Sequence, residues 1–397
     1  MHFASLNFLI FLIIVFSCYW FLVPKTKRSL FLLLCSLIFC LIYVKGYIFL
    51  FILMIVITYL VAGYIAKETD KKKIAFGMLL SYLIINLCFF KYFSQIADFF
   101  QRYCFSINPK LMVPDYVLPV GLSYITFRLI HYVVEAYRNK VAEASFADFA
   151  LYVLFFSLFP AGPVERFQRF HLQTRMGPQF EVSEINYGWL RILSGIVKKV
   201  FFADNLRRIL MPIVSFPQGY STGILILGVY GIAIQVYLDF SGYSDIAIGS
   251  ARLFGYKIIE NFHYPFFKPN IALFWRSWHI SVYSWIRDYF FLPLFGHRAS
   301  VFKLYLGILA SFVVFHLWHK ASLSFLVLGV YHGVGMIIWY LFQEIKRRNP
   351  IFKIRLFHHR LWRLPSTFLT FSFVSFGFIF FVTDLDKALN FIQAIWH

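Results

Sequence analysis

Two stretches of the chain crowd ionisable and aromatic side chains into otherwise apolar sequence. The first holds seven such residues within fourteen positions: Trp275, Arg276, Trp278, His279, Trp285, Arg287 and Asp288. The second closes an apolar run and contains His316, Trp318 and His319. Ionisable groups are costly in a run long enough to be buried in a bilayer. They therefore indicate a reaction site, a proton relay or a conduction pathway.

His319 is the strongest candidate for acid–base chemistry. Imidazole titrates near neutral pH, so a buried histidine beside a path for an alcohol can act as a general base. A structural histidine bonded to a nearby carbonyl is the alternative. His316, one turn earlier on the same face, raises the question of an HxxH metal site. Because no Glu stands at the required offset and no Cys or carboxylate cluster completes four ligands, we predict no metal.

His279 is expected to begin a helix. Trp275, His279 and Val282 then share one face, and Trp278 and Trp285 lie on the next. An aromatic belt at the membrane interface is the alternative. Two arginines, one aspartate and one histidine among these residues favour a site over a simple belt.

Asp239 and Asp245 lie in the apolar segment QVYLDFSGYSDIAIG, whose small residues allow close helix contact. We expect both carboxylates to form structural ion pairs rather than to act directly in catalysis. Their expected partners are Arg276, Arg287 or Arg252. His332 is likewise expected to be structural.

Composition restricts the fold class. The 397 residues are 60% hydrophobic and only 14% charged, whereas soluble proteins carry about 25% charged residues. The apolar runs are continuous rather than alternating, which favours an all-α, polytopic membrane protein over a β-barrel. The net charge of +20 lies in short basic clusters between apolar runs. This pattern indicates membrane orientation and anionic lipid contact, with no nucleic-acid partner.

We expect roughly ten to twelve membrane segments, with re-entrant and interfacial helices in addition. The clearest spans are residues 3–23, 30–44, 47–66, 74–93, 222–254, 322–342 and 367–382. Basic clusters after the first and third spans place these ends in the cytoplasm and the N-terminus outside. Residues 94–118 are expected to form a loop with a surface helix. In residues 187–202, Lys198 and Lys199 are expected to snorkel to an interface.

Two features indicate polar groups packed against protein rather than lipid. Within residues 118–139, Arg128, His131 and Glu135 share one helix face because they are spaced three and four residues apart. Residues 146–159 precede PAGPVERFQRFH, in which two prolines and a glycine break any helix. A broken, charged segment at membrane depth must line a cavity or be buried in protein, so a re-entrant element is expected.

Taken together, these motifs resemble the membrane-bound O-acyltransferase (MBOAT) family. The resemblance runs from about Leu118 to His332 and follows the family's motif order: LPVGLSYITFR, AGPVERFQRF, VKKVFFADNL, YLDFSGYSDIAIG, ENFHYPF, FWRSWHISVYSWIRDYFF, LWHKAS and VYHG. Two bacterial branches fit: the membrane subunit of alginate and other polysaccharide O-acetyltransferases, and the teichoic-acid D-alanyl transfer protein. The family usually has glycine where His316 and Lys320 stand here, and these larger neighbours are expected to narrow the passage.

The resemblance implies a ring of tilted helices around a thinned centre, formed by a single membrane domain over residues 1–397. Its motif core is 118–333, preceded by membrane helices in 1–117 and followed by a basic loop and last span in 344–397. The family's catalytic histidine corresponds to His319 and its second signature histidine to His279. The expected substrate tunnel comprises Trp275, Arg276, Trp278, Arg287, Asp288, Trp318, His316, Asp239 and Asp245.

The implied activity is acyl transfer, most simply of an acetyl group, to a hydroxyl of a cell-envelope polysaccharide or of a relay partner. The donor is a cytoplasmic thioester, either acetyl-CoA or an acyl carrier protein, and no bound cofactor is expected. The expected partners are an extracytoplasmic acyl-relay or acetyltransferase protein, a cytoplasmic acyl carrier protein and membrane lipid. The expected location is a bacterial plasma membrane. D-alanyl transfer to teichoic-acid-like acceptors, and a non-catalytic transporter or scaffold, remain the alternatives.

Overall fold

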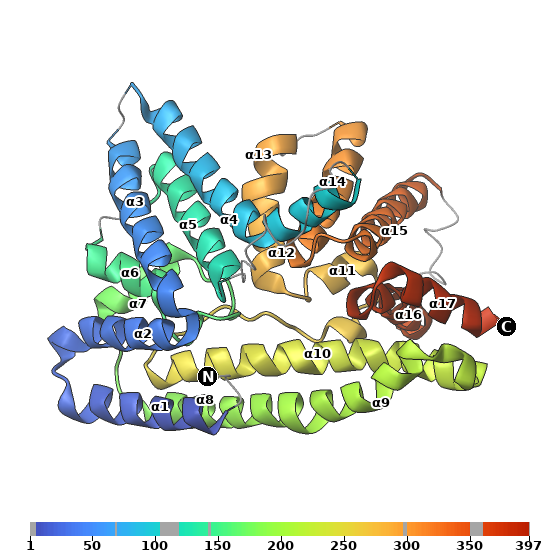
Figure 1. The fold of residues 1–397 in the computed structure, drawn as a ribbon, viewed down its shortest axis with the longest axis horizontal. Coiled ribbons are helices and arrows are strands. Elements are labelled where there is room, and N and C mark those ends of the chain that lie inside the picture. Colours follow the sequence, from blue (N-terminus) through green and yellow to red (C-terminus); the bar gives the residue numbers. More distant parts are fainter. Residues whose placement is uncertain are drawn as a thin grey trace. The chain divides into compact units, whose positions relative to one another are not determined.

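The computed structural model describes residues 5–67, 70–103, 119–141, 144–296, 300–349 and 360–396. Nearly all of them lie in helices (Figure 1), and within these ranges the β-type pairing is an isolated bridge between Phe262 and Trp278. The predicted all-α fold is therefore confirmed.

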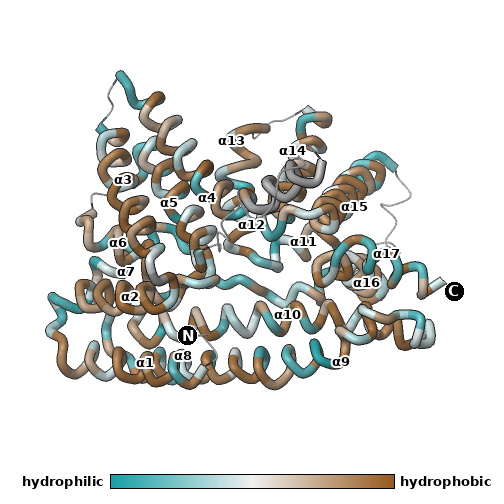
Figure 2. Tube along the Cα trace, in the orientation of Figure 1, coloured by the Kyte–Doolittle hydropathy of each residue, from teal (hydrophilic) through white to brown (hydrophobic). Residues whose placement is uncertain are grey.

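Seven helices of the described part are long and apolar enough to cross a membrane, and their apolar residues dominate the tube in Figure 2. They are Lys25–Val44, Ile48–Ala66, Lys72–Phe93, Thr222–Leu253, Val301–His319, Leu323–Arg348 and Arg363–Val382. Six of them overlap spans expected from the sequence, and Val301–His319 is the apolar run that ends with His316, Trp318 and His319. The expected first span, residues 3–23, is not among the seven. The total of ten to twelve segments stays a prediction, since it includes shorter elements such as Leu6–Leu22.

The N-terminal helices follow the expected spans. They are α1 (Leu6–Ser17), which continues as a π-helix over Cys18–Leu22, α2 (Arg28–Val44), α3 (Ile48–Ala66) and α4 (Lys72–Tyr103). Helix α4 runs ten residues beyond the predicted end at position 93, so the loop expected from residue 94 is wrong as far as Tyr103. The rest of that loop, residues 104–118, lies outside the described residues.

The remaining helices position the candidate residues. They are α5 (Leu122–Tyr137), α6 (Phe146–Leu154), α7 (Phe167–Met176), α8 (Val182–Ile196), the π-helix η5 (Val197–Ala203), α9 (Asp204–Ser215), α10 (Thr222–Leu253), α11 (Ile271–Trp275), α12 (Ile280–Ile286), the π-helix η8 (Arg287–Phe291), α13 (Leu292–Phe295), α14 (Val301–His319), α15 (Leu323–Arg348), α16 (Arg363–Val382) and α17 (Leu385–Trp396). Helix α17 follows the last expected span and is absent from the sequence-based expectations. Positions 350–359 of the basic loop lie outside the described residues.

The chain divides into two compact units. Unit 1 comprises Met1–Ser194 and Tyr243–Ile259, and unit 2 comprises Gly195–Gly242 and Glu260–His397. The helices α8 and α10 contribute residues to both. The expected single membrane domain stays a prediction.

In unit 1, the C-terminal part of α10 packs closely against α8. A Cβ atom at Gly249 would lie 2.7 Å from the carbonyl oxygen of Gly188. This close approach brings the Nε of Arg191 within 2.7 Å of the Oδ1 of Asp245. The expected partner Arg252 instead pairs with Glu184. The ion pair predicted for Asp245 therefore exists, but with a different arginine.

In unit 2, α10 packs in the same way at Gly242 against the end of α8 and the start of η5. A Cβ atom at Gly242 would lie 2.7 Å from the carbonyl oxygen of Gly195 in α8 and 3.0 Å from the backbone nitrogen of Lys199 in η5. The ammonium of Lys199 pairs with Asp239 and, at 2.8 Å, with Asp204. Asp239 therefore has a lysine partner, not one of the predicted arginines. Lys199 is bound within the protein, where snorkelling was expected.

Candidate active site

The helices α14 and α15 form a tight hairpin that carries three of the candidate histidines. Only residues 320–322 separate the helices, and small residues let their backbones approach. A Cβ atom at Gly329 would lie 2.8 Å from the Cα of Val313 and 3.0 Å from the carbonyl oxygen of Phe312. The hairpin thus fixes the end of α14, where His316 and His319 lie.

Substitution of Gly329 by alanine is expected to loosen this hairpin. The new methyl group meets backbone atoms, which cannot rotate away, so we expect destabilisation of about 1–3 kcal/mol. The thermal unfolding midpoint in detergent measures the loss. Gly77→Ala in α4 is the matched control, because its Cβ meets nothing within 4 Å and alanine favours helix. Equal midpoints for the two variants would contradict the close packing.

His319 lies at the last position of α14, half-buried among aromatic rings. Its ring centroid is 4.6 Å from that of Trp318, 5.2 Å from Phe315 and 5.6 Å from Phe381. The neighbouring Lys320 turns away, since its Nζ lies 3.2 Å from the Oδ1 of Asp384. Partial exposure in an apolar surround is suited to a base that must meet a substrate while bulk water is limited.

His279 directly precedes the helix α12, as expected, but its own backbone forms a strained turn. Its φ of 46° and ψ of 48° are left-handed, and it caps the N-terminus of α12. The turn is held by the bond from the Ile280 N–H to the Asn261 carbonyl (3.0 Å) and by the bridge between Phe262 and Trp278. The continuous helical face expected through Trp275 and His279 is therefore wrong. Non-glycine residues in this conformation are uncommon and often lie at functional sites.

The His279 ring is buried, at 1% exposure, beside that of His319. Their centroids are 6.2 Å apart, and Phe240 lies edge-on to His279 at 4.5 Å. Burial lowers the pKa of His279 to about 3, so its imidazole is neutral at pH 7. Its Nε2 has no hydrogen-bond partner among the described residues. A neutral ring with an unsatisfied nitrogen can bond to a reacting group.

Two substitutions separate the backbone role of His279 from its ring chemistry. Asparagine tolerates the left-handed conformation, so His279→Asn is expected to fold normally and yet lose most acyl transfer. The β-branched His279→Val is expected to lose activity and also about 1–3 kcal/mol of stability, because its backbone is strained there. Thermal unfolding and turnover are measured in parallel. Full activity of the folded His279→Asn protein would exclude a role for the ring.

His316 and His332 form a second, deeper histidine pair. Both are buried, at 3% and 1% exposure, and their rings stack with centroids 5.4 Å apart. The Nδ1 of His316 lies 2.8 Å from the Phe312 carbonyl, and because a carbonyl only accepts, this nitrogen carries the proton. Trp275 packs edge-on to His332 at 4.9 Å. No group of three or more metal-ligating side chains occurs among the described residues.

A cavity of about 430 Å³ lies within unit 2 beside these histidines. Its walls come from α11 to α15, and Phe315 lines it while also contacting His319. Of the expected tunnel residues, those at the cavity are Trp275, Arg276 and Arg287. The lining residues that the sequence did not single out include Tyr283, Ser311, Met336 and Tyr340. Ser311 follows from its helical spacing of three and four residues from Ile308 and Phe315. No sequence signal indicates Tyr283, Met336 or Tyr340.

The other expected tunnel residues lie elsewhere among the described residues. Trp278 stacks on Phe274 at 5.6 Å, and the Oδ1 of Asp288 accepts from the Nε of Arg287 at 2.7 Å. Asp239 and Asp245 are in the ion pairs described above. Trp318 and His316 adjoin the His319 and His332 rings, respectively. A role for any of these residues in a substrate tunnel stays a prediction.

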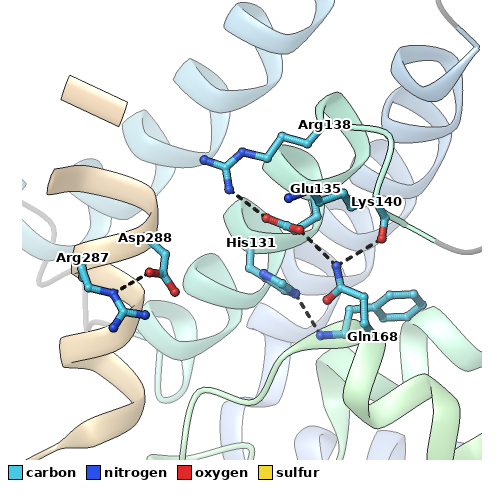
Figure 3. Close-up of polar contacts among 8 residues, drawn as sticks. His131, Glu135, Arg138, Lys140, Gln168, Arg287 and Asp288 are labelled. Atoms are coloured by element: carbon cyan, nitrogen blue, oxygen red, sulfur yellow. Dashed lines mark hydrogen bonds and ion pairs between the residues drawn. The ribbon is translucent and has the colours of Figure 1, made fainter. Parts of the chain in front are cut away.

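A separate polar cluster in unit 1 holds the broken segment after α6. The Nη1 of the fully buried Arg128 donates to the Val153 carbonyl and its Nη2 to the Leu158 carbonyl, both at 2.8 Å. The Nε2 of His131 accepts from the Phe167 N–H at 2.9 Å (Figure 3). Glu135 is buried as well. The prediction that this face packs against protein is confirmed, and the cluster serves structure.

Residues 74–353 match the model of the MBOAT, membrane-bound O-acyltransferase family. This match covers more than half of the chain and contains both histidine pairs. The chain belongs to the MBOAT family. The members of this family are membrane-bound O-acyltransferases, which transfer acyl groups to hydroxyls.

Three relatives show the range of acceptors within similar sequences. The probable alginate O-acetylase AlgI of Pseudomonas aeruginosa is 33% identical over 85% of this chain, which spans 66% of that protein's length. The peptidoglycan O-acetyltransferase of Helicobacter pylori is 27% identical over 97% of this chain and 77% of its own length. The teichoic acid D-alanyltransferase of Bacillus subtilis is 28% identical over 66% of this chain and 68% of its own. Both branches expected from the motifs are represented.

Proposed function

We propose that this enzyme transfers an acetyl group from a cytoplasmic thioester to a hydroxyl of a cell-envelope polysaccharide, directly or through a relay partner. The observation that carries this proposal is the half-buried His319 beside the buried, neutral His279. The alginate and peptidoglycan O-acetylating relatives support a polysaccharide acceptor. Their bacterial sources support a bacterial plasma membrane.

In the proposed reaction, His319 is the general base. Its imidazole removes the proton of the acceptor hydroxyl as the oxygen attacks the thioester carbonyl carbon. The tetrahedral intermediate then collapses, the carbon–sulfur bond breaks, and the thiolate leaves and takes the proton from His319. The products are an acetyl ester and a free thiol. A positioned base contributes about 10²–10⁴-fold to such a step.

His279 is proposed to position the reacting carbonyl. Its unsatisfied Nε2 is buried near the His319 ring, where a hydrogen bond to the developing oxyanion is strengthened by the low dielectric. We further propose that a cytoplasmic acyl carrier protein or coenzyme A brings the donor. A separate extracytoplasmic protein would complete transfer to the final glycan.

D-alanyl transfer is the second candidate function, because the Bacillus subtilis relative carries that name. The two functions share the attack on a thioester and differ in the acyl group and the carrier. The same His319 chemistry serves both.

A comparison of two acyl donors tests the proposal. Purified protein in lipid is incubated with a cell-envelope glycan as acceptor and, if required, the relay partner. The donor is either radiolabelled acetyl-CoA or a radiolabelled D-alanyl carrier protein, and transfer of the acyl group is measured. We expect turnover with acetyl-CoA that depends on His319. Turnover with the D-alanyl carrier alone would replace the acetyl proposal by D-alanylation. The absence of turnover with either donor would contradict the proposal that the enzyme uses a thioester.

A further inference from the structure

The cavity in unit 2 combines an apolar wall with positive charge. Aromatic and aliphatic side chains dominate the lining, including Phe291, Leu292, Leu304 and Ile308. The charged groups among the described lining residues are Arg276 and Arg287, with no carboxylate among them. Such a cavity suits a ligand that has both a hydrocarbon chain and an anionic group.

The arginines are placed to meet an anion at the open side of the cavity. Both side chains are exposed. Arg276 bonds to the hydroxyl of Tyr283, another lining residue, and Arg287 uses its Nε for Asp288. Guanidinium groups bind phosphate through paired hydrogen bonds and are the preferred partners of phosphodiesters. Basic pockets between membrane helices bind anionic lipid headgroups in the same way.

The apolar wall has the length of a lipid chain. Leu304, Ile308, Phe312 and Phe315 follow one face of α14, spaced by four, four and three residues. At 1.5 Å per residue, this stripe spans about 16 Å, close to the thickness of half a bilayer core, about 15 Å. A pantetheine arm, which is rich in amides, would leave polar groups unpaired against such a wall.

We propose that this cavity binds an anionic phospholipid. Its phosphate lies between Arg276 and Arg287, and one acyl chain lies along the stripe on α14. The inner end of the stripe is Phe315, whose ring is 5.2 Å from that of His319 and 5.9 Å from that of His279. The bound lipid thereby supports one wall of the catalytic pocket. This binding is independent of the acyl donor and acceptor proposed above.

Native mass spectrometry of the delipidated protein in detergent tests the proposal. The protein is titrated with phosphatidylglycerol or with zwitterionic phosphatidylcholine. We expect one phosphatidylglycerol to bind at least about tenfold more tightly, since charge-assisted hydrogen bonds distinguish the headgroups. The double variant Arg276→Gln/Arg287→Gln should lose this preference. Ile308→Trp, which fills the cavity, should remove the bound lipid altogether.

A control variant and a competing ligand complete the lipid-binding experiment. Lys303→Gln removes an exposed cation at the start of α14 that does not line the cavity, and it should bind phosphatidylglycerol as the wild type does. If the wild type and the double variant each bound phosphatidylglycerol and phosphatidylcholine equally tightly, the proposal would be overturned. Displacement of phosphatidylglycerol by soluble phosphopantetheine would also overturn it, by assigning the cavity to the donor. Arg276 and Arg287 have exposed side chains, so we expect the double variant to fold. The test of lipid preference therefore holds even if Ile308→Trp does not fold.

Discussion

Replacement of His319 by alanine is expected to lower acyl transfer by about 10²–10⁴-fold while the protein remains folded. The imidazole is the proposed acceptor of the hydroxyl proton, and alanine has no group that can replace it. His319 is only half-buried, at the last position of α14, where its ring contacts those of Phe315, Trp318 and Phe381. Its removal should therefore cost far more activity than stability. Turnover and thermal unfolding of the purified variant measure the two effects.

An exposed histidine of the same unit provides the control. His263 is exposed, and its Nδ1 faces only the ammonium of Lys268 at 3.4 Å among the described contacts. His263→Ala is expected to keep wild-type turnover. If His319→Ala and His263→Ala were equally active, His319 would not be the base. If His319→Ala were inactive and unfolded, its loss would be structural.

Replacement of Arg128 by methionine is expected to have the largest effect on stability. The guanidinium is fully buried and makes two bonds of 2.8 Å to the carbonyls of Val153 and Leu158. Methionine conserves much of the volume but leaves both carbonyls without these donors. Hydrogen bonds to charged groups contribute about 1.5–3 kcal/mol each, so we expect a loss of about 3–5 kcal/mol. The free energy of unfolding in detergent measures it.

Arg138→Met is the matched control for this substitution. Arg138 pairs with Glu135 at 3.0 Å, but its side chain is 36% exposed, and such pairs contribute about 1 kcal/mol or less. If Arg128→Met also lowered the free energy of unfolding by only about 1 kcal/mol or less, the role assigned to the buried guanidinium would be contradicted. The segment after α6 would then be held chiefly by its apolar contacts.

Local spacing in the sequence predicted the elements that depend on neighbouring residues. The positions of Arg128, His131 and Glu135 indicate one protected helix face, and the structure buries all three. The prolines after Phe159 predict a broken segment enclosed by protein, which the structure also has, but α6 already ends at Leu154, five residues before the predicted limit. The seven long apolar helices follow directly from hydropathy.

Contacts between distant residues could not be predicted in this way. Asp245 pairs with Arg191, 54 positions earlier, because glycines on α8 and α10 allow their backbones to approach. The left-handed conformation of His279 depends on the loop at Asn261, so no local helical pattern reveals it. Tyr340 reaches the cavity only because α15 packs on α14. These features require the folded chain.

Transfer in proteoliposomes tests the central claim most directly. Protein is reconstituted with a polysaccharide acceptor enclosed, radiolabelled acetyl thioester is added outside, and acetyl ester on the enclosed polysaccharide is measured, with the relay partner supplied if required. We predict ester formation by wild-type protein and a loss of about 10²–10⁴-fold in His319→Ala. Equal ester formation by wild type and variant would contradict acyl transfer through His319.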